Sequence, residues 1–217
     1  MTANVVNRPL GAVSADITRA LNQLTFPSGF TYHLAGQTEQ QQGAFSSLGF
    51  AMALALMLVY MIMASQFQSL LDPFVIMFTV PLGFIGVIWM LLLTHTTLSI
   101  ISFMGVITMI GIVVSNGILL VDYANKLQAR GLPLHEAVVR AGRTRLRPIL
   151  MTAAATILGM IPMALGLGEG AETNMPLARA VIGGLTVSTG LTLLVIPVLY
   201  LLIERRFPRR HGTSLPA

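Results

Sequence analysis

The sequence predicts a mainly α-helical, polytopic membrane protein: a bundle of five transmembrane helices preceded by a short β-α-β segment. Three observations predict it. Hydrophobic residues make up 54% of the 217 positions and charged residues 10%, whereas a soluble domain carries roughly 25% charged residues. Five apolar runs each approach the about 20 residues that cross a hydrocarbon core. The basic residues cluster beside apolar runs, as in cytoplasmic membrane anchors.

The N-terminal segment, residues 1–42, has the pattern of a folded piece. Residues 2–6 and 30–35 have the composition of short strands. Between them, apolar residues recur at helical spacing behind Asn7, a candidate cap, and Pro9, a first-turn proline. These apolar positions are Leu10, Val13, Ile17, Leu21 and Leu24. Two strands and one helix bury too little surface to fold alone, so we expect the end of a larger α/β domain.

The next segment, residues 43–207, is expected to hold all five spans, with a tail at 208–217. The apolar runs cover residues 45–64, 73–93, 98–121, 148–167 and 177–203. Within them the only formal charge is Arg179, close enough to the start of its run to reach the interface. Glycines recur in the second, third and fifth runs, which indicates tight helix contacts or, alternatively, hinges.

The connecting segments predict the orientation of the chain. Most of the basic residues lie in the segment 122–147 and in the tail after Ile203, which the positive-inside rule places in the cytoplasm. The segment 166–176 has no Lys or Arg and belongs outside. With five spans and a cytoplasmic C-terminus, the N-terminal portion lies outside. Because residues 1–42 lack a signal-peptide pattern, we expect a fragment of a longer chain with at least one further span upstream.

The segment 122–147 has a helical periodicity of its own. Apolar Leu134, Ala137 and Val138 fall on one face, and arginines occupy another. This pattern predicts an amphipathic helix lying at the membrane surface, attracted by anionic lipids.

Polar residues inside the runs are the candidate functional residues. Ser115 and Asn116 lie in the middle of the third run, and Thr152 and Thr156 lie one turn apart in the fourth. Such groups either hold helices together or take part in an ion relay, although neither Ser115 nor Asn116 can titrate. Asp122, directly after the third run, is expected to be an interfacial carboxylate near Lys126 or near the basic segment that follows.

Several chemistries are not expected. The sequence has no cysteine, so disulfides and thiolate sites are unavailable. The phosphate-binding pattern GxxxxGK[ST] is absent, and the four histidines are far apart in sequence without metal-ligand spacing. A net charge of +5 does not predict nucleic-acid binding, because the basic residues flank membrane spans. We expect no enzyme activity, no metal site and no cofactor.

Four stretches together resemble the resistance-nodulation-division (RND) efflux permeases, in particular the hydrophobe/amphiphile (acriflavin-resistance) multidrug branch. They are GQTEQQQ at 36–42, IGIVVSNGILLVDYAN at 110–125, RLRPILMT at 145–152 and VIGGL at 181–185. The resemblance covers nearly the whole chain. It implies the last five of twelve spans, preceded by the end of a periplasmic porter domain. It also implies a homotrimer in the bacterial inner membrane that works with a periplasmic adaptor and an outer-membrane channel.

The resemblance also implies roles for four residues in a proton relay. In the family's drug pumps, a lysine in the third of these spans pairs with two aspartates of the N-terminal half. Ser115 stands at that lysine position, Asn116 matches the neighbouring asparagine, Thr152 the relay threonine and Arg145 the arginine before it. A serine cannot neutralise two aspartates. Either the proton is shared with other partners, or another cation drives transport.

The leading hypothesis is therefore part of a proton-motive-force-driven permease that exports hydrophobic or amphiphilic compounds. The alternatives are a heavy-metal cation efflux permease of the same family, and a truncated membrane module that does not transport. The methionines, 13 in all, lie mainly in the apolar runs, where packing explains them better than metal binding.

Overall fold

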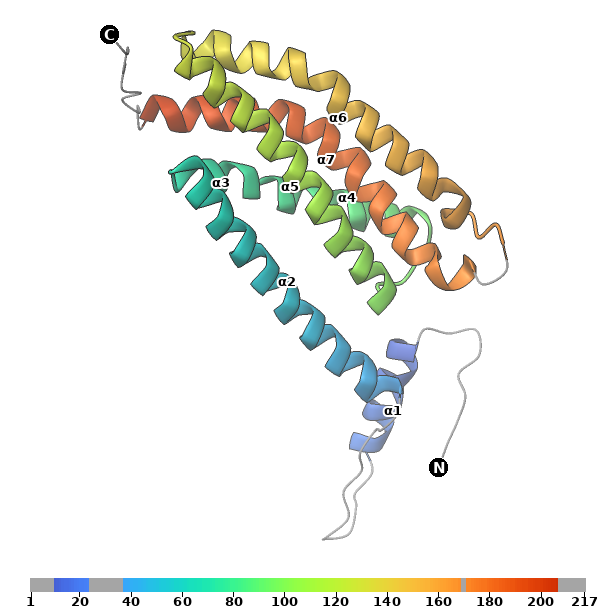
Figure 1. Cartoon of the computed structure of the whole chain (residues 1–217). Coiled ribbons are helices and arrows are strands. Elements are labelled where there is room, and N and C mark those ends of the chain that lie inside the picture. Colours follow the sequence, from blue (N-terminus) through green and yellow to red (C-terminus); the bar gives the residue numbers. More distant parts are fainter. Residues whose placement is uncertain (1–9, 24–36, 169–170, 207–217) are drawn as a thin grey trace. The chain divides into compact units, whose positions relative to one another are not determined.

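The computed structural model describes residues 10–23, 37–168 and 171–206, and this part of the chain contains only helices and their connections (Figure 1). The chain divides into two compact units, residues 1–51 and 52–217. The helices are α1 (Leu10–Asn22), α2 (Gln37–Phe67), α3 (Leu71–Met77), α4 (Thr79–Leu93), α5 (Ile100–Ala129), α6 (Leu134–Ala164) and α7 (Ala171–Arg206).

The first unit contains the helix predicted behind Pro9. This is α1, in which Arg19 pairs with Asp16 at 3.1 Å. The strands predicted at 2–6 and 30–35 lie outside the described residues, as do the cap Asn7 and Pro9, so the β-α-β piece is not shown.

The five predicted spans are confirmed. Five helical segments are long and apolar enough to cross a membrane: Gly43–Phe67, Leu71–Leu93, Ile100–Ala129, Leu134–Ala164 and Ala171–Glu204. The second span is broken, because α3 and α4 meet at Phe78. Pro81 explains the break: its ring disturbs the helix around residue i−4, which is Met77. The Thr79 hydroxyl donates to the carbonyl of Ile76 at 2.7 Å and satisfies one backbone group there.

The expectation of a separate surface helix between the third and fourth spans is wrong. α5 starts at a capping box made by Ser99 and Ser102 and continues to Ala129, and α6 runs without interruption from Leu134 through Pro148. Pro148 removes one backbone donor but does not end the helix, as is common in membrane bundles. The buried positions Ala137, Ala141 and Ile149 stay on one broad side of α6, so a single helix packs both parts. The basic residues therefore extend a span instead of lying across it.

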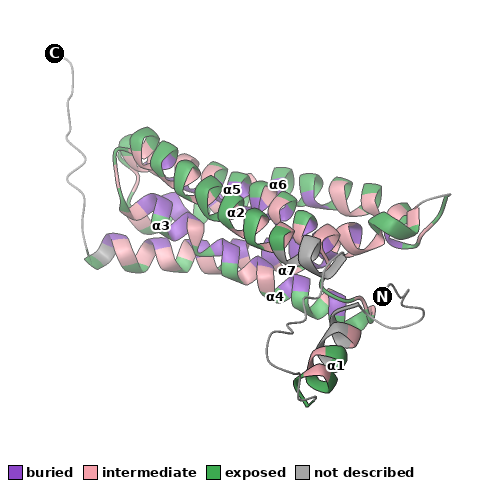
Figure 2. Ribbon diagram, turned by 90° about the horizontal axis from the view of Figure 1, so that it is seen from below, coloured by how far each residue is buried: buried purple, intermediate pink, exposed green. Residues whose placement is uncertain are grey.

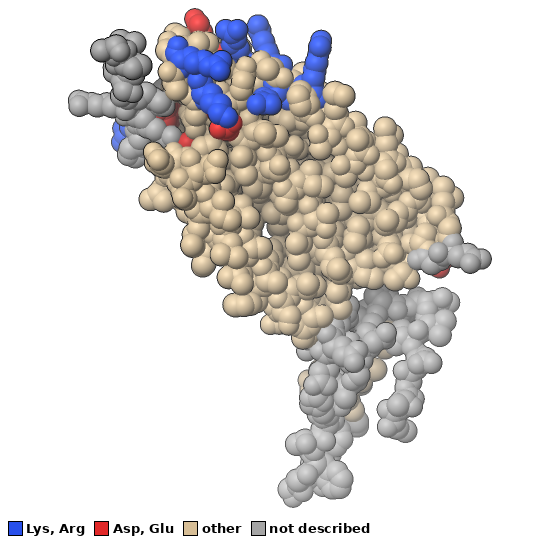
Figure 3. Space-filling model, viewed as in Figure 1, with Lys and Arg blue, Asp and Glu red and all other residues tan. Residues whose placement is uncertain are grey.

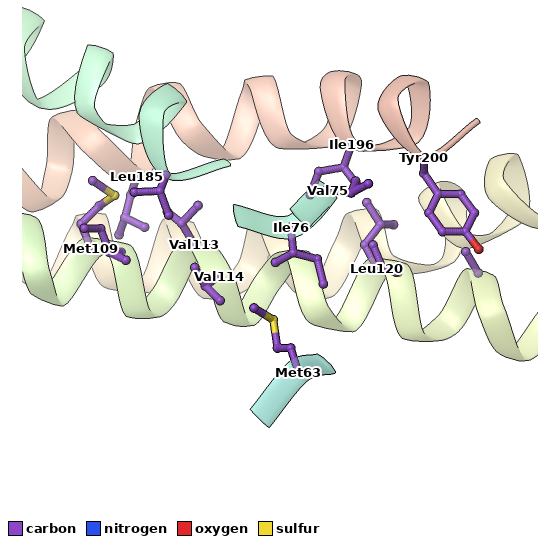
Figure 4. Packing of buried hydrophobic residues seen from close by; sticks show 14 of the residues in the cluster. Met63, Val75, Ile76, Met109, Val113, Val114, Leu120, Leu185, Ile196 and Tyr200 are labelled. Atoms are coloured by element: carbon purple, nitrogen blue, oxygen red, sulfur yellow. The ribbon is translucent and has the colours of Figure 1, made fainter. Parts of the chain in front are cut away.

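The core of the second unit lies where α5 and α7 meet. Met109 and Val113 of α5 pack with Leu185 of α7, and Ile196 of α7 packs with Ile76 of α3 further along (Figure 4). Burial is highest along α5, while much of α6 is exposed or intermediate (Figure 2).

Glycines allow α7 to approach α4 and α5 closely. A Cβ atom on Gly183 of α7 would lie 2.6 Å from the carbonyl oxygen of Gly86 in α4. A Cβ atom on Gly105 of α5 would lie 2.6 Å from the carbonyl oxygen of Leu177 in α7. Both distances are too short for any side chain, so tight contact is confirmed for these glycines. Gly111 differs, because no atom lies within 4 Å of the corresponding position.

Arg179 joins three elements at the end of the bundle where α4 and α6 end. Its Nε donates to the carbonyl of Ala164, the last residue of α6, at 3.2 Å. Its Nη1 donates to the Thr96 hydroxyl at 2.7 Å in the turn between α4 and α5. The guanidinium thus compensates a helix C-terminus, where unpaired carbonyls favour a cation.

We expect Gly86→Ala to destabilise the bundle, because the new Cβ atom would collide with the backbone of α7 and lie 2.7 Å from Val187 Cβ. Overpacking of this kind costs about 1–3 kcal/mol. Thermal unfolding of the purified protein in detergent measures the change. The control is Gly159→Ala in α6, where the added atom meets nothing within 4 Å. Equal midpoints for the two variants would contradict the close approach of α4 and α7.

Candidate functional site

Ser115 lies on an open apolar groove of the second unit. The groove has a volume of about 370 Å³ between the C-terminal part of α2 and α5. Ser115 is the one polar side chain among its lining residues, which are Met52, Ala55, Leu56, Val59, Ile107, Ile110, Gly111, Val114, Ser115 and Ile118. The side chain is exposed in this chain. A lone hydroxyl at mid-span therefore faces the space beside α5 rather than the helices packed behind it.

Asn116 points to a different side of α5. It is buried, with 7% of its surface exposed, and it lines a narrow cavity with Val113, Ile149 of α6 and three hydroxyl residues of α7. The hydroxyl residues are Ser188, Thr189 and Thr192, and the Thr192 Oγ1 atom is buried without a hydrogen-bond partner in the described part of the chain. The prediction that Asn116 faces other helices is confirmed. The cavity is too narrow for a water molecule, so no water bridges these groups.

Thr152 and Thr156 satisfy their hydroxyls within α6. Thr152 donates to the carbonyl of Pro148 at 3.0 Å, and Thr156 donates to the carbonyl of Thr152 at 2.9 Å. Because the Thr152 hydroxyl donates this bond, both lone pairs of its oxygen stay free to accept, and the side chain is exposed. It remains able to accept a hydrogen bond from a group outside this chain.

Arg145 is held between α6 and α5. Its guanidinium carbon lies 4.8 Å from the centre of the Tyr123 ring, within cation–π range. Its Nε is buried without a hydrogen-bond partner among the described residues. Of the four predicted residues, none forms a hydrogen bond with another in this part of the chain. Asn116 is joined to the bundle interior, while Ser115 and Thr152 are presented outward.

The expected pairing of Asp122 is confirmed. Lys126 donates to its carboxylate at 2.7 Å across one turn of α5, and both side chains are partly exposed. Such an exposed ion pair contributes little to stability, and its position is that of an ordinary surface pair on one helix.

A buried polar network near the end of α5 was missed from sequence. Asn125 of α5 donates to the carboxylate of Asp72 in α3 at 2.9 Å. The Tyr200 hydroxyl of α7 donates to Asn125 Oδ1 and accepts from Gln128 Nε2 at 2.8 Å. Asp72 and Tyr200 are 1% and 3% exposed. Three helices are therefore joined through polar groups at one end of the bundle.

One sequence signal points to this network. Asp72 directly precedes the proline that begins an apolar run, and it falls inside the span as the structure defines it. The predicted run begins at residue 73, so the sequence placed this acid just outside the span.

A family model described as the AcrB/AcrD/AcrF family matches residues 1–204 of the chain. The chain belongs to this family of RND permeases. The five apolar helices agree with this match, because a family of membrane permeases requires several spans.

The similar proteins are named for different functions. The chain is 38% identical over 215 residues to the swarming motility protein SwrC of Bacillus subtilis and 37% identical over 217 residues to the cobalt-zinc-cadmium resistance protein CzcA of Cupriavidus metallidurans. It is 36% identical over 203 residues to the multidrug resistance protein MdtC of Erwinia amylovora. These matches cover 99%, 100% and 92% of this chain and 20% of each relative.

The structure also matches a solved one. A crystal structure of a heavy metal efflux pump superposes with a TM-score of 0.83 at 35% identity, covering 94% of this chain and 20% of that one. The chain thus spans about a fifth of the length of the proteins that it matches.

We expect Tyr200→Phe to lower stability, because it leaves the half-buried amides of Asn125 and Gln128 without their shared partner. Loss of such bonds costs about 1–3 kcal/mol. The matched control is Tyr60→Phe, which removes only an exposed bond of 3.0 Å to the carbonyl of Leu70. Thermal unfolding midpoints compare the two variants. A larger loss in the Tyr60 variant would contradict the structural role of the network.

Proposed function

We propose that this chain forms the C-terminal part of an RND permease that uses proton influx to export hydrophobic or amphiphilic compounds across the bacterial envelope. The observation that carries the proposal is the presentation of Ser115 and Thr152 on outward surfaces of α5 and α6, at positions that the family resemblance assigns to the coupling site. Polar groups at mid-span are costly in a membrane and mark ion pathways.

The chemistry of these groups limits their role. Serine, asparagine and threonine donate and accept hydrogen bonds but do not change charge near neutral pH. The buried acids within the spans, Asp72 and Glu204, lie at the span ends and not at mid-span. We therefore place the proton carrier in the part of the permease outside this chain, with Ser115, Asn116 and Thr152 as its hydrogen-bonding support. Arg145 lies two turns before Thr152 in α6 and supplies a fixed positive charge there, and its Nε has no hydrogen-bond partner among the described residues.

The charge distribution supports the proposed orientation. Basic side chains gather at the end of the bundle where α5 passes into α6 (Figure 3). By the positive-inside rule, this end lies in the cytoplasm, and residues 1–42 lie in the periplasm. The proposed partners are the lipid bilayer, the N-terminal half of the permease, two further copies in a homotrimer, a periplasmic adaptor and an outer-membrane channel.

Heavy-metal export is the second candidate. It is favoured by the similarity to CzcA and to the solved heavy metal efflux pump, while the similarity to MdtC favours multidrug export. The described residues contain no group of three or more His, Cys, Asp or Glu side chains that could hold a metal ion. A metal path would therefore need other ligand types, such as methionine, or ligands outside the described residues.

The substrate class can be tested in cells that express the complete permease and lack their own exporters. We expect higher resistance to amphiphilic dyes and detergents, with unchanged resistance to Co²⁺, Zn²⁺ and Cd²⁺. The opposite pattern would favour the metal candidate. Resistance to neither group, with normal membrane insertion, would favour a module that does not transport.

We expect Asn116→Ala and Thr152→Ala each to remove most of the proton-driven export without lowering the amount of permease in the membrane. The matched control is Thr186→Ala, because Thr186 is also exposed and also donates to the carbonyl four residues before it, at 2.7 Å. Dye efflux under an imposed pH gradient measures the effect. Wild-type efflux in both test variants would rule out the relay role.

A further inference from the structure

The outer side of α6 carries a stripe of arginines. Arg140, Arg143 and Arg147 are spaced three and four residues apart, so they lie above one another on one face over about 10 Å. All three are exposed, and none pairs with a carboxylate among the described residues. The only acid in α6 is Glu136, one turn before Arg140. No acidic residue of α6 therefore lies close to Arg143 or Arg147.

An exposed apolar strip continues the same face of α6 beyond Pro148. Helical spacing places Met151, Leu158 and Leu165 below the arginines, with Leu150 beside them. Their exposed fractions are 72%, 64%, 65% and 45%. This face differs from the one that carries Thr152, which lies about 100° around the helix from Met151. One continuous surface is therefore cationic at one end and apolar for the rest of its length.

The length of α6 sets the depth of the arginines. Its 31 residues span about 46 Å, whereas a hydrocarbon core is about 30 Å thick. If the other end of α6 is level with the core surface, roughly the first ten residues project beyond the core. Arg143 then lies at the interface, and Arg147, one turn further in, reaches the lipid phosphates by extending its side chain along the helix. A guanidinium can donate two parallel hydrogen bonds to two oxygens of one phosphate group. Arg145, two residues away, is held at Tyr123 and does not join the stripe.

We propose that this face of α6 is a binding site for an anionic phospholipid of the cytoplasmic leaflet, with its phosphate between Arg143 and Arg147 and its acyl chains along Met151 and Leu158. The cationic end above an apolar strip complements a lipid with a negative head and apolar tails. The site rests on the orientation proposed above but not on the relay or on the substrate class.

The first test uses the complete permease, purified and delipidated, with dioleoylphosphatidylglycerol as the probe and dioleoylphosphatidylcholine as the neutral comparison. Native mass spectrometry counts retained lipids and gives apparent affinities. Each arginine near a lipid surface contributes about fivefold, so R143Q/R147Q is expected to bind phosphatidylglycerol about 25-fold more weakly. Phosphatidylcholine binding is expected to stay unchanged.

The matched control is R130Q, which removes an exposed charge at the C-terminus of α5, away from the apolar strip. It is expected to keep the wild-type affinity. If R130Q loses as much affinity as the double variant, only the general positive charge of this end matters, and the site is overturned. Should the double variant fail to fold, R147Q alone carries the comparison, with a loss of about fivefold.

The second test asks whether lipid or protein covers the strip. A nitroxide is attached at Leu158→Cys in a permease freed of other cysteines and placed in phosphatidylglycerol-containing nanodiscs; this chain itself contributes none. A lipid-facing label is relaxed by oxygen and not by a water-soluble nickel complex. Protection from both would show that another helix occupies the strip, and would overturn the proposal.

Discussion

The close backbone approach of α7 to α4 and α5 is the constraint on which the rest of the bundle depends. In lipid there is no hydrophobic force between helices, so association relies on van der Waals contact and interhelical hydrogen bonds. At Gly86 and Gly183 the two backbones meet without intervening side chains, and at Gly105 α5 meets α7 in the same way. α7 is thereby held against α4 and α5, and its hydroxyl residues line the same narrow cavity as Asn116.

Polar groups in the bundle are distributed by depth. The ends are joined by strong, satisfied interactions: the Arg179 guanidinium at one end, and the Asp72, Asn125 and Tyr200 network at the other. The middle contains only neutral side chains around Asn116, packed without room for water. Charged groups at mid-span would cost far more than these neutral ones. This distribution leaves the interior around Asn116 without room for water and places the charged groups at the ends of the bundle.

Two faces of the bundle have different chemistry. The groove beside α5 is apolar except for the Ser115 hydroxyl, which suits a surface that meets further helices of the permease. The outer face of α6 is cationic above and apolar below, which suits a lipid. The outer face of α6 depends on the helix being continuous through Pro148, because a break there would separate the arginines from the apolar strip.

The sequence by itself determined the five spans, the helix at Leu10–Asn22, the pairing of Asp122 with Lys126 and the inward side of Asn116. These follow from composition, helical period and short spacing along one helix, all of which are local. Only the tertiary structure decided that Asp72 and Tyr200 meet around Asn125, since these residues are far apart in sequence and come from three helices. It also decided that Ser115 and Asn116, neighbours in sequence, face a groove and the interior respectively. The physical reason is that a helix turns about 100° per residue, and only the positions of its neighbours determine which side is filled.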